Sequence, residues 1–331
     1  MDKQRYEAFK DGLARDFKLK FKGEAIAKTP RLKLSWSNWG FGVESLDRTA
    51  RRLERNGVEW LELHGNRYGK DLGYKSAEVL KVLGDHGVKV SGVCGIFGAE
   101  NDLSSNSGVS RQRALDYIRR QLELCAETGG TYLLVVPGAV GRPAPYDDGE
   151  FDRSAATLRL VADDFAQAGV KAAIEPIRAA EVSLVRNVAE ARRYLAAVGH
   201  PGVAHINGDV YHMQSEEWNI AAAILDAGDA LANLHLADSN RCALGQGSMD
   251  VDAIIMALYC LGFPDGPRFA TPEPLGPGGN PYPAMFGKPD ETLLDALVAD
   301  TARCWREREE WLRGVAAGEV GHAAATPGAP D

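Results

Sequence analysis

The sequence of 331 residues has little cysteine, no long apolar run and no excess of basic residues. Its five cysteines are scattered and form no CxxC pair, so we expect reduced thiols in a cytoplasmic protein. No apolar run approaches the roughly 20 residues of a membrane span, and the charged N-terminal stretch lacks the apolar segment of a secretory signal. The net charge of −8 argues against a nucleic-acid partner, because phosphate binding needs a basic surface.

A repeat of strand, helix and glycine runs through the chain from residue 31 onward. Each apolar strand ends in polar residues, an amphipathic helix follows, and a glycine suited to a helix C-cap leads into the next strand. The expected strands are residues 32–37, 58–65, 88–95, 131–138, 170–177, 203–209, 232–238 and 269–274.

Eight β-then-α units in one chain favour an α/β fold, the (β/α)8 or TIM barrel. The strands are nearly continuous apolar runs, as in a parallel sheet covered by helices. An open doubly wound sheet is the alternative, but neither GxGxxG nor GxxxxGK[ST] follows a strand. The expected helices include residues 45–56, 110–128, 187–198, 251–261 and 290–311.

The chain divides into three parts in this prediction. Residues 1–30 form an N-terminal extension with an amphipathic helix around Arg5 to Phe17, and residues 31–312 form the barrel. Residues 313–331 are small, polar and proline-bearing, so we expect a disordered tail.

Four predicted strands end in a side chain that can bind a divalent metal ion: Glu175, Asp209, His235 and Glu273. Catalytic groups of TIM barrels sit at the C-terminal ends of the strands, where these four are expected to meet. Two Glu, one Asp and one His suit a hard-to-borderline ion such as Mn²⁺, Mg²⁺ or Co²⁺.

Each of the four has a plainer explanation when it is taken alone. Glu175 could form an ion pair with Arg178, and Asp209 could cap a loop. His235 could be a satisfied core histidine, and Glu273 could belong to a turn between two prolines. Their occurrence together, on strands five to eight, favours a metal site, since an unpartnered buried carboxylate is costly.

Other side chains follow the strand ends and are expected to line a substrate pocket: Trp36, Trp39, His64, His212, Asn240 and Arg241. Indole rings can cover the apolar face of a sugar, although packing of the first loop is the plainer explanation. Glu62, in contrast, is expected at the barrel bottom or in the outer layer, with no chemical role.

These residues carry a family pattern, and over about residues 31–312 the chain resembles the sugar phosphate isomerase/epimerase superfamily. These are xylose isomerase-like TIM barrels that include D-tagatose 3-epimerase. The resemblance lies in NDLSSNS at 101–107, IEP at 174–176, DVYHM at 209–213, HLADSNR at 235–241 with GQGSMD at 245–250, and PEP at 272–274.

The resemblance implies metal ligation by Glu175, Asp209, His235 and Glu273, with Mn²⁺ as the expected ion. It also implies substrate contacts from His212 and Arg241. In the epimerases the two ligand glutamates face each other across the substrate as acid and base, so Glu175 and Glu273 are the catalytic candidates, together with His212.

Two departures from the epimerase pattern bear on the substrate. The epimerases follow their first glutamate with Leu-Asn-Arg-aromatic-Glu, whereas this chain has IRAAE, which keeps Glu181 but places Arg178 and two alanines at substrate-reading positions. A long Gly- and Pro-rich loop, LGPGGNPYPAMFGKPD at 275–290, follows Glu273 and could act as a lid or subunit contact.

With the N-terminal extension, these departures resemble the α subunit of the C-glycoside deglycosidation enzymes. That resemblance predicts a lyase that cleaves 3-oxo-C-glycosides, with a small β subunit and an oligomeric assembly. The alternative is a ketose 3-epimerase or aldose–ketose isomerase on a sugar substrate. A nucleic-acid repair endonuclease and a non-catalytic sugar-binding barrel are alternatives from other classes.

Overall fold

The computed structural model describes residues 3–65, 73–276 and 290–319. Most of the loop at 275–290, with its predicted role as a lid or subunit contact, lies outside these residues. The predicted disorder of the C-terminal tail likewise falls mainly on residues that are not described.

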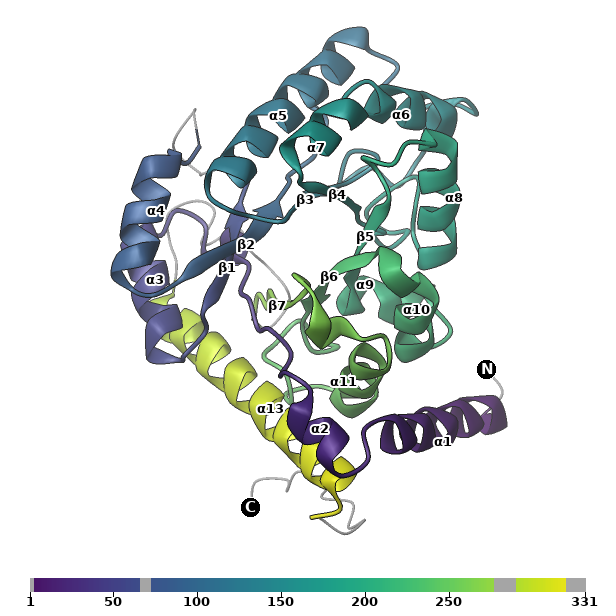
Figure 1. The fold of residues 1–331 in the computed structure, drawn as a ribbon. Coiled ribbons are helices and arrows are strands. Elements are labelled where there is room, and N and C mark those ends of the chain that lie inside the picture. The colour runs from purple at the N-terminus through teal and green to yellow at the C-terminus, as the bar shows by residue number, and fades with distance from the viewer. Residues whose placement is uncertain (1–2, 66–72, 277–289, 320–331) are drawn as a thin grey trace.

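Seven parallel strands form one sheet in the described part of the chain, and they are paired in chain order. They are β1 (Trp60–His64), β2 (Lys89–Cys94), β3 (Tyr132–Val135), β4 (Lys171–Ile174), β5 (His205–Asp209), β6 (Leu231–Leu236) and β7 (Phe269–Pro272). The strands surround a common centre and the helices lie outside them (Figure 1). This arrangement confirms the predicted TIM barrel fold.

The first predicted strand, residues 32–37, is not a regular strand, and on this point the prediction was wrong. It makes isolated parallel bridges from Leu34 to Ala270 and from Ser37 to Glu62. The Ser35 amide donates to the Ala270 carbonyl at 2.9 Å, and the Trp36 amide donates to the Trp60 carbonyl at 3.0 Å. The segment therefore lies between β7 and β1 and links them, but it pairs with each over too few residues to form a continuous ladder.

The helices follow the strands as expected. Those of the barrel are α3 (Leu46–Arg55), α4 (Ser76–Asp85), α5 (Gly108–Glu127), α6 (Glu150–Arg159), α7 (Ala162–Ala168), α8 (Val188–Val198), α9 (Val210–Glu216), α10 (Ile220–Ala227), α11 (Val251–Cys260) and α13 (Glu291–Ala317). The side chains of Ser45, Asn187 and Asp290 accept backbone N–H groups at the starts of α3, α8 and α13. These caps fix the helix starts close to the predicted positions.

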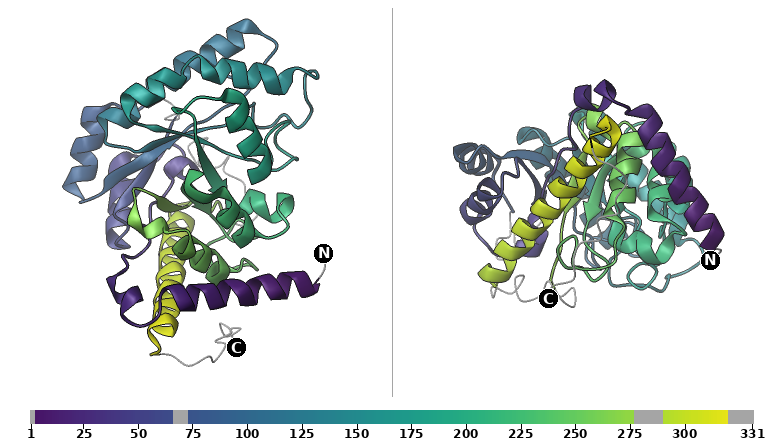
Figure 2. Two further views of the ribbon diagram at one scale, coloured as in Figure 1. Left: turned by 45° about the vertical axis from the view of Figure 1, so that its right-hand side comes forward. Right: turned by 90° about the horizontal axis from the view of Figure 1, so that it is seen from below.

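The N-terminal extension is folded against the barrel. It consists of α1 (Lys3–Lys20) and α2 (Glu24–Lys28), and α1 packs on α11 and α13. Phe17 and Phe21 lie edge-on to Tyr259 of α11, with ring centroids 5.7 and 5.5 Å away. Figure 2 shows α1 and the long α13 together on the outside of the barrel. Helix α13 continues to Ala317, past the predicted barrel boundary at residue 312.

An aromatic cluster fills the N-terminal end of the barrel interior. Tyr132 and Phe269 begin β3 and β7, and both are buried with Ala173, Ala232 and the partly buried Trp60. This plug leaves the C-terminal strand ends as the place for polar side chains.

Among the described residues, no helix combines the length and apolar character that crossing a membrane would require. All five cysteines are free thiols.

Candidate functional site

The structure brings Glu175, Asp209, His235 and Glu273 together at the C-terminal ends of the strands. All four are buried, with exposed fractions between 1% and 6%. Glu175, Asp209 and His235 each offer one potential ligand atom, and these three atoms lie within 4.8 Å of one another. His235 Nδ1 is 3.2 Å from Glu175 Oε1 and 3.2 Å from Glu273 Oε2, so the fourth residue joins the same cluster.

The sheet itself sets the positions of these four side chains. Asp209 of β5 and His235 of β6 are direct partners in the register of the two strands. Glu175 directly follows β4, and its amide donates to Val135 of the neighbouring strand at 3.0 Å. Glu273 directly follows β7, and its amide donates to Leu236 at 2.8 Å. The cluster is therefore built on rigid backbone rather than on loops.

His235 is oriented by a carboxylate on its far side. Its Nε2 lies 3.0 Å from both Oε1 and Oε2 of Glu62, whereas its buried Nδ1 has no hydrogen-bond partner. An imidazole that donates one N–H to a carboxylate and presents the other nitrogen to an acidic cluster has the usual arrangement of a metal ligand. The residues present thus fit a divalent ion.

Electrostatics favour a positive charge at this centre. Burial raises the pKa of Glu273 to about 8, and the charges of Asp209 and Glu175 add to this against the opposing effect of His235. Burial alone would lower the pKa of His235, but the carboxylates of Glu273 and Glu62 raise it well above its usual value. A cation bound among these groups would relieve the repulsion between the carboxylates.

Polar donors hold each carboxylate in place. The Asn207 amide donates to Glu175 Oε1 at 2.8 Å, and the Tyr211 backbone N–H donates to Asp209 Oδ1 at 2.8 Å.

Glu273 accepts from Trp39 Nε1 at Oε2 and from Arg241 at Oε1, the latter at 3.1 Å. The alternative ion pair of Glu175 with Arg178 is not formed, and Arg178 pairs with Glu181 at 2.5 Å instead.

His212 and Arg241 lie in the same cluster. His212 Nε2 is 3.2 Å from Asp209 Oδ2, and the buried His212 Nδ1 has no hydrogen-bond partner. The Arg241 guanidinium lies 4.4 Å from the ring centroid of Tyr211 and 5.7 Å from that of Trp39. Arg241 has a φ of 63°, which non-glycine residues rarely adopt, and such strain is often found at functional sites.

Three other predicted pocket residues have different surroundings. Trp36 is part of the hydrophobic core and stacks on Phe41 at 6.0 Å, so the structure gives no support for a substrate contact. Asn240 is exposed and holds its own loop by donating to the Gln246 carbonyl at 2.9 Å. His64 is buried at the end of β1, and burial lowers its pKa to about 3, which keeps the imidazole neutral.

Glu62 is the residue that sequence reasoning misplaced. The prediction of a position at the barrel bottom or in the outer layer was wrong, because its carboxylate lies fully buried in the barrel interior. It accepts from the Tyr132 hydroxyl at 2.7 Å as well as from His235.

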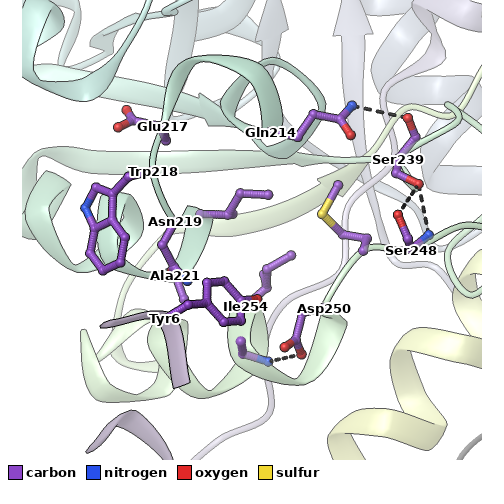
Figure 3. Close-up of a pocket in the computed structure, with 13 residues that line it drawn as sticks. Tyr6, Gln214, Glu217, Trp218, Asn219, Ala221, Ser239, Ser248, Asp250 and Ile254 are labelled. Atoms are coloured by element: carbon purple, nitrogen blue, oxygen red, sulfur yellow. Dashed lines mark hydrogen bonds between the residues drawn. The ribbon is translucent and has the colours of Figure 1, made fainter. Parts of the chain in front are cut away.

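A separate hollow of about 240 Å³ lies between α1 and the starts of α10 and α11. Figure 3 shows its walls, among them Tyr6, Trp218 and Asp250, with Gln214 and Ser239 on the barrel side. None of the four clustered carboxylate and imidazole residues lines it. The hollow is therefore distinct from the candidate metal centre.

Comparisons with known proteins agree with this fold. The family described as the xylose isomerase-like TIM barrel matches residues 50–287. The 3-dehydro-D-guloside 4-epimerase of Escherichia coli (strain K12) is 30% identical over 236 residues, which are 69% of this chain and 87% of that protein. The ketose 3-epimerase of Arthrobacter globiformis is 30% identical over 187 residues, 56% of this chain and 64% of that protein.

Solved structures show the same architecture. An L-ribulose 3-epimerase superposes with a TM-score of 0.75 and 22% identity, covering 90% of this chain and all of that one. The apo form of a 3-keto-D-glucoside 4-epimerase from E. coli superposes with a TM-score of 0.66 and 26% identity, over 86% of this chain and 99% of that one. The chain belongs to the xylose isomerase-like TIM barrel family, within the sugar phosphate isomerase/epimerase superfamily.

Proposed function

We propose that the protein is a metal-dependent epimerase that removes and returns a proton at a carbon next to the ketone of a sugar or glycoside. The observation that carries this proposal is the placement of two buried carboxylates, Glu175 and Glu273, from β4 and β7, 3.2 Å from the same imidazole nitrogen of His235. The named relatives are sugar epimerases, which supports an enzyme that acts on carbohydrates.

These relatives favour the epimerase alternative over the C–C bond-cleaving lyase. Within the epimerases, a keto-glycoside is the substrate class that we favour. The 4-epimerase relative acts on a 3-dehydro-glycoside by its name, and the match covers 87% of its length. Arg178 occupies a substrate-reading position of the ketose epimerases. In this chain it forms an ion pair with Glu181 and donates a hydrogen bond to the Tyr211 hydroxyl at 3.0 Å.

Glu175, Asp209, His235 and Glu273 would hold the metal ion, for which we propose Mn²⁺, with Mg²⁺ or Co²⁺ as alternatives. When bound, the ion would act as a Lewis acid toward the ketone oxygen and stabilise the negative charge that develops on deprotonation.

The chain's own residues supply the proton transfers. Epimerisation needs one group to take a proton and another to return one on the opposite face of the sugar. Glu175 and Glu273 come from different strand ends and can act in these two roles, with His212 as a further candidate. Arg241 is held against Tyr211 and Glu273, where its guanidinium can bind substrate oxygens. The burial of both carboxylates limits access of competing water.

The first experiment is an assay in D₂O with added Mn²⁺, using a 3-keto-glucoside, a 3-oxo-C-glucoside and a free ketohexose as substrates. Deuterium at the carbon next to the ketone, in a sugar that stays whole and changes configuration, is the expected result. Release of the aglycone would establish the lyase instead. If no substrate reacts with Mn²⁺, Mg²⁺ or Co²⁺, the proposed activity on these substrates is wrong.

The small β subunit and the oligomeric assembly stay predictions. Light scattering after size-exclusion chromatography measures the mass in solution. The D₂O assay, repeated with a candidate second subunit, tests whether a partner is required.

A further inference from the structure

A buried carboxylate outside the ligand cluster contacts the imidazole within it. Glu62 lies on β1 and His235 on β6, which are not neighbours in the sheet, so their contact crosses the barrel interior. Both oxygens of Glu62 lie 3.0 Å from His235 Nε2, and the side chain of Glu62 is fully buried. No metal ligand predicted from the sequence and no motif of the family resemblance includes this residue.

The position of Glu62 is itself fixed. The Tyr132 hydroxyl donates to Glu62 Oε2 at 2.7 Å, and Tyr132 is wholly buried in the aromatic plug. The Asn233 side-chain amide lies 3.5 Å from the same oxygen and donates at 2.7 Å to Asn207, which in turn donates to Glu175. Glu62 is therefore held by groups that belong to the rigid interior of the barrel.

This geometry has one consequence for the histidine. A carboxylate can only accept hydrogen bonds, so His235 Nε2 must carry the hydrogen. A neutral His235 then has its lone pair on Nδ1, which lies between Glu175 and Glu273 and has no hydrogen-bond partner. The side chain is thereby prepared to ligate through Nδ1 without a change of rotamer.

We propose that Glu62 is a positioning residue that selects the tautomer and orientation in which His235 binds the metal ion. This inference rests on the metal centre of the proposed function. Loss of a carboxylate behind a ligand histidine typically weakens metal binding by about 10- to 100-fold. The same range is expected here.

The test compares Glu62→Gln with Glu309→Gln in the full-length protein. Each protein is titrated with Mn²⁺, and calorimetry measures the heat of binding and hence the Kd. Glu309 is a matched control, because it is also buried and accepts from a tyrosine hydroxyl, that of Tyr259 at 2.7 Å, and from the Leu32 amide at 2.8 Å. None of these groups belongs to the metal centre. We expect Glu62→Gln to raise the Kd for Mn²⁺ about 10- to 100-fold, and Glu309→Gln to leave the Kd within about twofold of the wild type.

The outcomes separate the inference from the proposed function. If the wild type does not bind Mn²⁺, Mg²⁺ or Co²⁺ with one-to-one stoichiometry, the metal centre itself is wrong. If the wild type binds and Glu62→Gln binds equally well, only the role of Glu62 is wrong. An equal loss in both variants would show a general effect of removing a buried charge and would also overturn the inference.

A second measurement uses the wild-type protein, so it does not depend on the folding of a variant. Histidine labelled with ¹⁵N and ¹³C, observed by NMR in the Mg²⁺-loaded wild type and assigned through bonds from the backbone of His235, reports which ring nitrogen carries hydrogen. We expect a protonated Nε2 and an unprotonated Nδ1. A hydrogen on Nδ1 would contradict the proposed orientation.

Discussion

Glu175 and Glu273 are held by different donors, and separate tasks in proton transfer are proposed for them. Glu175 accepts from the neutral amide of Asn207, whereas Glu273 accepts from Trp39 and the charged Arg241. Both carboxylates are needed if proton removal and proton return occur on opposite faces of one substrate. Neither can be replaced by its neighbour, because each is fixed at its own strand end.

The substitutions Glu175→Gln and Glu273→Gln are therefore expected to abolish turnover while the fold stays intact. Each removes an ionisable group and a proposed metal ligand, and loss of general acid–base catalysis alone costs about 10²- to 10⁴-fold. The measurements are kcat on the epimerisation substrate and the circular dichroism spectrum, with Glu309→Gln as the control for loss of a buried carboxylate. Near-normal activity in both variants would contradict the site assignment.

The sequence placed the four candidate ligands at strand ends, where the structure has them, but misplaced Glu62. In a parallel barrel, strand ends meet by topology, so a polar residue that ends an apolar run can be assigned to the site without side-chain detail. Residues inside a strand are different, because both faces of the sheet are buried. In WLELH the buried Leu61 and Leu63 flank Glu62, and alternation alone does not tell which face points into the barrel.

At the scale of elements, helix starts were more predictable than the pairing of the first predicted strand. Ser45, Asn187 and Asp290 are strong N-caps, and their local hydrogen bonds fix the helix start whatever the tertiary context. The segment at 32–37 carries the apolar pattern of a strand, yet its pairing depends on how β1 and β7 approach each other when the barrel closes. The distance between β1 and β7 is a property of the whole sheet, and the local sequence does not determine it.

The N-terminal helix α1 is expected to be a structural part of the barrel rather than a detachable extension. Phe17 is 1% exposed and packs edge-on against Tyr259. We expect Phe17→Ala to lower the free energy of unfolding by about 3–5 kcal/mol, the usual cost of truncating a buried phenylalanine. Urea denaturation measures this cost.

The control for this prediction lies on the same helix. Leu19 is 71% exposed, and Leu19→Ala is expected to change the free energy of unfolding by no more than about 0.5 kcal/mol. A cost of less than about 1 kcal/mol for Phe17→Ala would mean that α1 unfolds separately from the barrel.

At the scale of the whole molecule, the proposed metal centre would link several strands into one unit. Its candidate ligands come from β4, β5, β6 and β7, so an ion that binds only the folded chain stabilises the whole barrel. Mn²⁺ at 100 times its Kd is expected to add about 2.7 kcal/mol to the free energy of unfolding, seen as a rise in Tm.

Asp209→Asn provides the matched variant for that measurement. Asn keeps the size of the side chain and can still accept the Tyr211 N–H that Asp209 accepts at 2.8 Å, so the helix cap is retained. The rise in Tm with Mn²⁺ should nearly disappear in this variant. An undiminished rise would mean that the ion binds at another place in the molecule.

Two histidines outside the metal centre are expected to give the stability of the molecule opposite dependences on pH. Burial, together with the charge of Lys171, lowers the pKa of His205 to about 4. Between that value and the ordinary 6.5, the unfolded chain binds more protons than the folded chain, so the contribution of His205 to stability is lost as the pH falls.

The hydrogen bond with Glu54, at 2.7 Å from His86 Nδ1, and a second with Asp47 raise the pKa of His86. Its contribution is present below pH 6.5 and is lost as the pH rises through the folded-state pKa.

The substitutions His205→Gln and His86→Gln separate these two effects when urea denaturation is measured from pH 4.5 to 8, a range set by ordinary and shifted histidine pKa values. Relative to the wild type, His205→Gln should become more favourable as the pH falls below about 6.5, because the wild type alone then loses stability by excluding a proton. His86→Gln should be least stable relative to the wild type at low pH, where the wild-type imidazolium contacts Glu54 and Asp47. Parallel profiles for the two variants would contradict the opposite pKa shifts. Profiles with opposite slopes would agree with burial as the main cause at His205 and hydrogen bonding to carboxylates as the main cause at His86.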